Sequence, residues 1–113
     1  MMAGIPAGFL EVLAEQRRHY VDALPAKMAE MDRLCGALRA NAGGAEAERL
    51  AAIAHGIAGS AAVFGFEALS RDARTLLLEV RARTVSGGSL PGESADAIAA
   101  ALERVRGCAA EAK

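Results

Sequence analysis

The sequence predicts an all-α fold, an up-and-down antiparallel four-helix bundle with an N-terminal helical extension. Alanine, the best helix former, makes up about a quarter of the 113 residues, whereas aromatic residues make up 4%. Apolar residues recur at spacings of three and four, and no segment alternates as a strand does. Glycine and proline separate these periodic stretches, and the short connections favour antiparallel neighbours. We expect a single domain, residues 1–113.

The first periodic stretch runs from residue 7 to residue 40 and predicts helix. Its apolar positions are Leu10, Leu13, Tyr20, Leu24, Met28, Met31, Cys35 and Leu38. Pro25 lies inside the stretch, where it removes an amide donor and crowds the preceding turn. The stretch is therefore either two helices that meet near Leu24 or one kinked helix. It ends at a loop signal, residues 41–44.

Two further helices are predicted on either side of Gly65. The first covers residues 45–64 and ends at this glycine, a residue type that suits the C-terminus of a helix. The second covers residues 67–84 and ends before the Ser-Gly-Gly-Ser sequence at 86–89. Its inner stripe consists of Leu69, Ala73, Leu76, Leu77 and Val80.

The last helix is predicted to open at residues 91–94, where a proline and a serine stand close together. Its apolar face consists of Ile98, Leu102 and Val105. Residues 109–113 are expected to fray, as the ends of chains commonly do.

Composition excludes several functional classes. The formal net charge is -1 and no basic face is evident, so we expect no nucleic-acid partner. No apolar run approaches the roughly 20 residues that a membrane span requires, and residues 1–13 lack the basic start of a signal peptide. Cys35 and Cys108 have neither disulfide-motif nor metal-ligand spacing. We therefore expect free thiols in a reducing cytoplasm and no membrane partner.

The segment around His55 holds the most informative pattern. In a helix each residue advances by about 100°. The large apolar residues of the segment are Leu50, Ile53, Ile57 and Phe64. All four fall within about 40° of the direction opposite His55, so burying them turns the imidazole outward.

Small residues surround His55 on its own face. They are Ala51, Ala52, Ala58 and Gly59 one turn away and Ala62 farther on, with Glu48 two turns before. Gly56 and Gly59 each cost the helix about 1 kcal/mol relative to alanine. Such a bare surface would let the active site of another protein reach the ring. Two plainer interpretations remain: an ordinary surface histidine, and glycines that serve close helix packing.

His19 offers a contrast, because Arg17 and Arg18 stand beside it and no bare patch surrounds it. We interpret it as an ordinary surface residue.

Residues 55–65 resemble the signature of histidine-containing phosphotransfer (HPt) domains of bacterial two-component phosphorelays. That signature has a histidine, an aliphatic residue two positions later, then a glycine, a small pair and a closing glycine. His55, Ile57, Gly59, the pair 60–61 and Gly65 match it. Residues 68–69 and 76–79 are similar to the next helix of the family, and residues 20–25 to a stretch common before its first bundle helix.

The resemblance implies a phosphocarrier in which His55 accepts and donates a phosphoryl group. The partner would be the receiver domain of a response regulator, of a hybrid histidine kinase, or of both. This chain would need no cofactor or metal, because the receiver supplies acidic residues and Mg²⁺, and it would not be an enzyme by itself. Candidate docking residues are Ala51, Ala52, Ala58, Gly59, Ala62 and Val63.

One position departs from the family pattern. The family often has lysine three residues after the histidine, where this chain has Ala58. Such a lysine could pair with phosphate or with an acidic partner. Arg49, Arg71 and Arg74 are candidates to supply the charge instead.

Two other functions stay open on the sequence alone. The bare face could bind a receiver or another signalling protein without phosphorylation, an interpretation that Ala58 favours. A small enzyme with His55 as its base is a weaker alternative, because only Glu48 is expected near it. A metal site is weaker still, since two histidines at unrelated positions make no ligand set.

Overall fold

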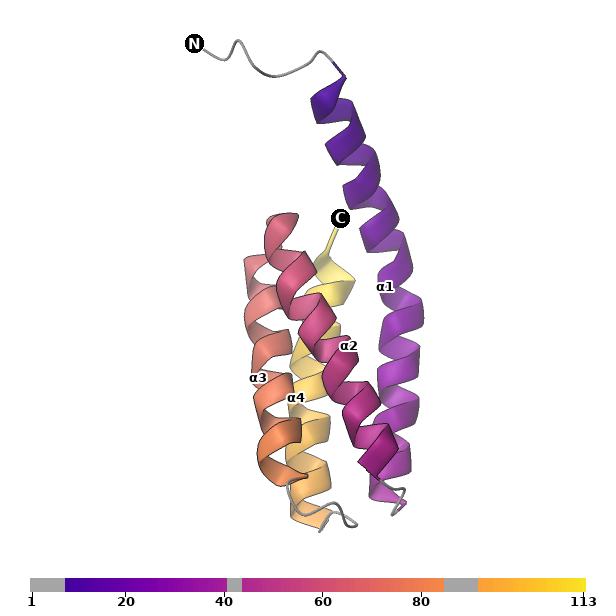
Figure 1. The fold of residues 1–113 in the computed structure, drawn as a ribbon, viewed down its shortest axis with the longest axis vertical. Helices are drawn as coiled ribbons and strands as arrows, with labels where there is room; N and C mark the ends of the chain where they lie inside the picture. Colours follow the sequence, from indigo (N-terminus) through magenta and orange to yellow (C-terminus); the bar gives the residue numbers. More distant parts are fainter. Residues whose placement is uncertain (1–7, 41–43, 85–91) are drawn as a thin grey trace.

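The computed structural model describes residues 8–40, 44–84 and 92–113. These residues form four helices and no strand: α1 (Phe9–Arg39), α2 (Gly44–Val63), α3 (Glu67–Arg83) and α4 (Gly92–Glu111). Each helix packs against its neighbours in sequence, and α4 closes the ring by packing against α1 (Figure 1). The predicted up-and-down bundle is therefore confirmed. The loop signals at 41–43 and 86–89, with Pro91, lie outside the described residues.

The first periodic stretch is a single helix that passes through Pro25. The proline is exposed, while its neighbour Leu24 is buried on the bundle side. A proline ring has no amide hydrogen, so the carbonyl of Val21 lacks its usual helical donor. Burial of one continuous apolar stripe offsets that local loss, since tertiary packing supplies most of a helix's stability. The stripe in α1 consists of Leu24, Met28, Met31, Leu34, Cys35 and Leu38.

The predicted N-terminal extension is the first part of α1, which continues past the end of the bundle (Figure 1). Contact with the bundle is made at Arg17. Its guanidinium lies over the ring of Phe66, 4.4 Å from the centroid, and donates hydrogen bonds to the backbone carbonyls of Phe64 and Lys113. The apolar side chains before this point remain exposed. They are Phe9, Leu10, Val12 and Leu13.

The core contains one stripe from each helix. Its largest fully buried side chains are Leu24, Met31, Leu50, Ile57, Leu69, Leu76, Val80, Ile98, Leu102 and Val105. Alanines fill the positions between them, and Ala54, Ala61 and Ala73 are each 0% exposed. Small side chains allow two helix backbones to approach closely, and α2 and α3 form the most extensive helix pair. Within the described ranges, no helix has the length and hydrophobicity needed to cross a membrane.

The two cysteines are free thiols, as expected. Cys35 is buried, and Cys108 is half-buried on α4, where its thiol donates a hydrogen bond to the carboxylate of Asp72 on α3 at 3.1 Å. Burial raises the pKa of the Cys108 thiol to about 11, and the hydrogen bond and negative charge of Asp72 act in the same direction.

The expectation that residues 109–113 fray is wrong for most of this segment. The last helix continues to Glu111. Ala109 and Ala112 pack against the core, which supplies the tertiary contacts that a free chain end lacks.

Candidate functional site

His55 is exposed near the middle of α2, as the periodicity predicts. Leu50 and Ile57 are 0% and 1% exposed, and their burial fixes the rotation of the helix about its axis. Among the described residues, no side chain forms a hydrogen bond or an ion pair with the imidazole. The ring is therefore free to meet a partner.

Polar contacts define the two flanks of α2. On one flank Arg49 forms an ion pair with Glu30 of α1 at 3.0 Å, and the hydroxyl of Ser60 contacts that of Tyr20 at 3.0 Å. On the other flank the hydroxyl of Ser70 on α3 donates a hydrogen bond to the carbonyl of Ala58. At about 100° per residue, His55 lies on the exposed arc nearer to α3.

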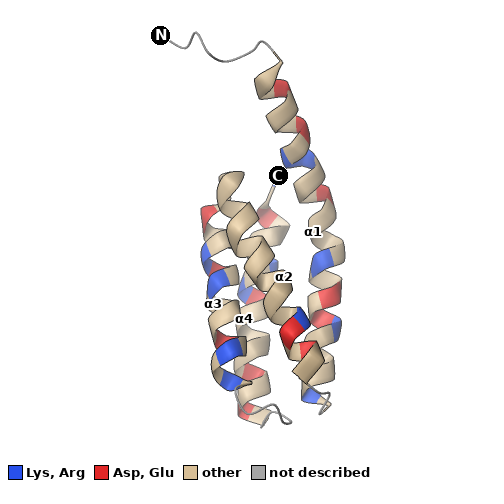
Figure 2. Cartoon of the chain, viewed as in Figure 1, with Lys and Arg blue, Asp and Glu red and all other residues tan. Residues whose placement is uncertain are grey.

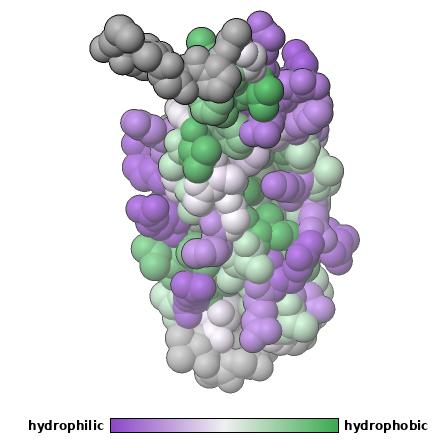
Figure 3. Space-filling model, turned by 45° about the horizontal axis from the view of Figure 1, so that its top comes forward, coloured by the Kyte–Doolittle hydropathy of each residue, from purple (hydrophilic) through white to green (hydrophobic). Residues whose placement is uncertain are grey.

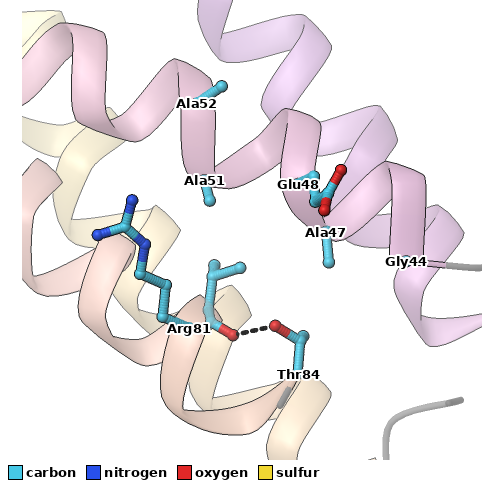
Figure 4. A pocket seen from close by; sticks show the side chains of 8 residues that line it. Gly44, Ala47, Glu48, Ala51, Ala52, Arg81 and Thr84 are labelled. Atoms are coloured by element: carbon cyan, nitrogen blue, oxygen red, sulfur yellow. Dashed lines mark hydrogen bonds between the residues drawn. The ribbon is translucent and has the colours of Figure 1, made fainter. Parts of the chain in front are cut away.

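Two hollows lie between α2 and α3. The first, of about 530 Å³, is shown in Figure 4 and is lined by Gly44, Ala47, Glu48, Ala51, Ala52, Val80, Arg81 and Thr84. In that view the Arg81 side chain extends from α3 toward α2, where the opposing alanines project little. The second, of about 270 Å³, is lined by Ala62, Glu67, Ser70, Arg71, Arg74, Thr75 and Leu78.

His55 falls between the two hollows along α2. Ala51, one turn before it, lines the first, and Ala62, two turns after it, lines the second. A projecting imidazole with a depression on each side can enter a partner's pocket while the rim of that pocket lies in the depressions.

The glycines beside His55 face open space. A Cβ atom added at Gly56 or at Gly59 would meet no other group within 4 Å. The interpretation that they serve close helix packing is therefore wrong. Because they have no side chains, no atoms project from positions 56 and 59 beside the imidazole.

Gly65 ends α2 with a φ of +85°, a conformation that glycine adopts without steric cost. Its amide donates to the carbonyl of Ala62 at 3.1 Å, and the next amide, of Phe66, donates to Ala61 at 2.9 Å. This pair of bonds is the Schellman pattern, which satisfies carbonyls left open at a helix end. The closing glycine predicted from the sequence has this role.

The predicted docking residues do not all lie on the open face. Ala52, Gly59, Ala62 and Val63 are exposed, and Ala51 is half-buried. The placement of Ala58 on the docking face is wrong, since it is 5% exposed and packed toward α3. Periodicity located the inward direction of α2 but could not show how closely α3 covers its flank.

The three candidate arginines also separate in the structure. Arg49 forms an ion pair with Glu30 on the α1 flank, away from α3. Arg71 and Arg74 are exposed on α3, where Arg71 lies 3.6 Å from Asp72. Arg74 forms no ion pair with any described residue.

Arg74 lies about level with His55. The bond between Ser70 and Ala58 sets the register of the two antiparallel helices. One turn onward from Ser70 along α3 is Arg74, and one turn back from Ala58 along α2 is the vicinity of His55.

Two residues on this face were not predicted from the sequence. Leu78, 59% exposed, and Arg81 continue the exposed stripe of Arg71 and Arg74 along α3 at helical spacing. Figure 2 shows that the middle and end of α2 carry no Lys, Arg, Asp or Glu, while α3 beside it carries basic residues with acidic ones among them. An exposed stripe of this kind looks like an ordinary solvated face until the neighbouring helix is placed.

The weaker alternatives gain no support from the geometry. Glu48 lies two turns, about 10 Å, from His55 along the axis, which is too far for a hydrogen bond. The described part of the chain also contains no group of His, Cys, Asp and Glu side chains that could hold a metal ion.

Comparison with known proteins identifies a family. A family model described as Hpt domain matches residues 15–108. No curated protein and no solved structure matches significantly. The matched range begins within α1 and ends within α4, so it includes the whole α2–α3 face.

The glycines lead to a prediction about stability. Replacing Gly56 or Gly59 with alanine should raise the free energy of unfolding by about 1 kcal/mol each, since alanine favours helix and nothing obstructs its methyl group. Urea denaturation followed by circular dichroism measures the change. Gly107→Ala, in open space on α4, is the matched control and should give a similar gain. A loss of stability at 56 or 59 alone would restore a packing role for these glycines.

Proposed function

The chain belongs to the Hpt domain family, and from this premise we propose that it carries a phosphoryl group on His55 between receiver domains of a two-component phosphorelay. The family itself is one of phosphotransfer in two-component signalling. One observation supports the assignment to His55 above all others: its imidazole is exposed in mid-helix beside two glycines that face open space.

The proposed chemistry uses the ring nitrogen remote from the backbone. Its lone pair attacks the phosphorus of an aspartyl phosphate on the receiver. A P–N bond forms as the P–O bond to the carboxylate breaks, and the aspartate leaves with that electron pair. The reverse step phosphorylates the next receiver. Phosphoryl transfer depends chiefly on positioning and charge stabilisation, and the receiver's carboxylates and Mg²⁺ would supply the latter.

This division of roles makes the chain a carrier rather than an enzyme. Its contribution is a nucleophile on a rigid helix, since the burial of Leu50 and Ile57 fixes the orientation of α2. Because receivers act in the cytoplasm, we place the protein there as well.

The docking surface that we propose combines α2 and α3. Ala52, Gly59 and Ala62 leave room for the partner on α2, and Arg74 and Arg81 add positive charge on α3. A receiver's phosphorylation pocket is acidic, so this arrangement is electrostatically complementary to it. Arg74 would act in place of the lysine that the family often has at position 58. Transient signalling interfaces are small, so we expect micromolar affinity.

The alanine at position 58 favours a second function. Without lysine at 58, the face could bind a receiver or another helical signalling protein and never be phosphorylated. Ala58 is the observation behind this alternative.

Replacing His55 with glutamine should abolish labelling by a receiver carrying radioactive phosphate, because the amide is not a nucleophile for phosphorus. In the wild type the label should be labile in acid and stable in base. His19→Gln is the matched control and should keep full labelling. Labelled His55→Gln protein would exclude His55 as acceptor, and an unlabelled wild type that still binds receivers would favour the second function.

Replacing Gly59 with arginine should slow transfer about tenfold or more by obstructing the approach to the ring. The substitution should leave the fold intact, since a side chain at 59 meets open space. Gly107→Arg on α4 is the control, to be compared in rapid-quench measurements of transfer. A Gly59→Arg variant that transfers at the wild-type rate would refute the docking surface.

Replacing Arg74 with alanine should slow transfer about fivefold at low ionic strength by removing an attractive charge. The difference should shrink as salt is added, because screening weakens exposed charges. Arg104→Ala, an exposed arginine on α4, is the control. Equal rates for both variants at low salt would show that Arg74 has no part in docking.

A further inference from the structure

The extension of α1 carries an apolar face with no cover among the described residues. Phe9, Leu10 and Leu13 on this face are 44%, 68% and 39% exposed. Within the bundle, apolar side chains of comparable size on α1 are buried, and Leu24 is only 1% exposed. A cluster of exposed large apolar side chains at one place commonly marks an interaction site.

This face continues the stripe by which α1 packs on its own bundle. Counting back from Leu24 in steps of four and three residues gives Tyr20, Arg17, Leu13 and Leu10. At about 100° per residue, Phe9, Leu10 and Leu13 point within about 60° of the direction of Leu24. The spacing is that of a coiled-coil seam extended beyond the bundle.

Charge is confined to the other side of the extension. Glu11 and Glu15 lie opposite the seam, and its flanks are Ala14 and Gln16. Two copies of the seam can therefore meet along residues 9–16 without opposing any charged side chain, while Arg17 on the same stripe is engaged by its own bundle. A lipid surface is a poorer match, because interfacial helices place basic residues beside the apolar face, whereas the charges before Arg17 are both acidic.

We propose that the extension is a homodimer interface, in which the α1 seams of two copies pair antiparallel about a two-fold axis. The direction follows from sterics. The seam lies on the side of α1 that the bundle occupies, so parallel pairing would force the two bundles into the same space. Antiparallel pairing places them at opposite ends and sets Leu10 against Leu13 of the second copy.

The paired extensions would lie next to the end of each bundle. At this end Arg17 lies on Phe66, and Phe64 is half-buried. Figure 3, which tips the upper end of the molecule toward the reader, shows hydrophobic side chains on that side with hydrophilic ones among them. His55 lies about 12 Å along α2 from its last residue, Val63, so each copy would keep its own α2–α3 face free.

Sedimentation velocity over about 10 to 500 µM tests the proposal independently of phosphotransfer. The wild type should form a dimer with a dissociation constant in the micromolar range, as a small interface implies. Leu10→Glu and Leu13→Glu should each weaken it at least tenfold. Ala26→Glu, at an exposed site of α1 within the bundle, should not. Circular dichroism confirms that each variant is folded. A wild type that stays monomeric throughout, or equal effects of the three substitutions, would overturn the proposal.

Two further readouts fix the direction of pairing and the occupant. Oxidising a mixture of the Leu10→Cys and Leu13→Cys variants should give mainly disulfides between one variant and the other. Disulfides formed mainly between two copies of the Leu10→Cys variant would refute antiparallel pairing. Vesicles of phosphatidylglycerol should not bind the wild type. Binding that Leu10→Glu abolishes, in a protein that does not self-associate, would assign the extension to a membrane surface instead.

Discussion

The packing of α2 against α3 determines where His55 and its neighbours lie. Ala54 and Ala61 of α2 and Ala73 of α3 are completely buried, and the hydroxyl of Ser70 binds the carbonyl of Ala58 between them. These contacts fix both the rotation of α2 and its register with α3. The exposure of His55, the two hollows beside it and the position of Arg74 follow from those two quantities.

Much of the fold could be predicted from the sequence, because its signals are local. Helical spacing and the glycines placed every helix end except the C-terminal end of α4 within one or two residues, and Gly65 closes α2 as its residue type suggests. Pro25 left two interpretations open, since a local rule cannot weigh one lost hydrogen bond against a buried stripe. The ordered end of α4 escaped prediction for the same reason, as Ala109 packs on residues distant in sequence.

Of the site, only His55 and its outward orientation could be predicted from the sequence. One helix's periodicity shows which way His55 points, but it does not show which neighbour covers each flank. Ala58 therefore proved buried, and Arg49 proved to be paired with α1. Leu78 and Arg81 were missed because their relation to His55 exists only across two helices. On this face α2 has small side chains that leave room for a partner, and α3 has charged ones. This combination becomes apparent only when the two helices are placed side by side.

The hydrogen bond from Cys108 to Asp72 has a consequence for how the molecule meets electrophiles. A thiol with a pKa of about 11 is almost entirely protonated at neutral pH, and the thiolate is the reactive form. Cys35 is sheltered by burial. The thiol groups, ordinarily the strongest nucleophiles in a protein, are thus protonated or buried here, whereas the imidazole of His55 is exposed to solvent. Alkylating and oxidising agents would accordingly find an imidazole more accessible than either thiol.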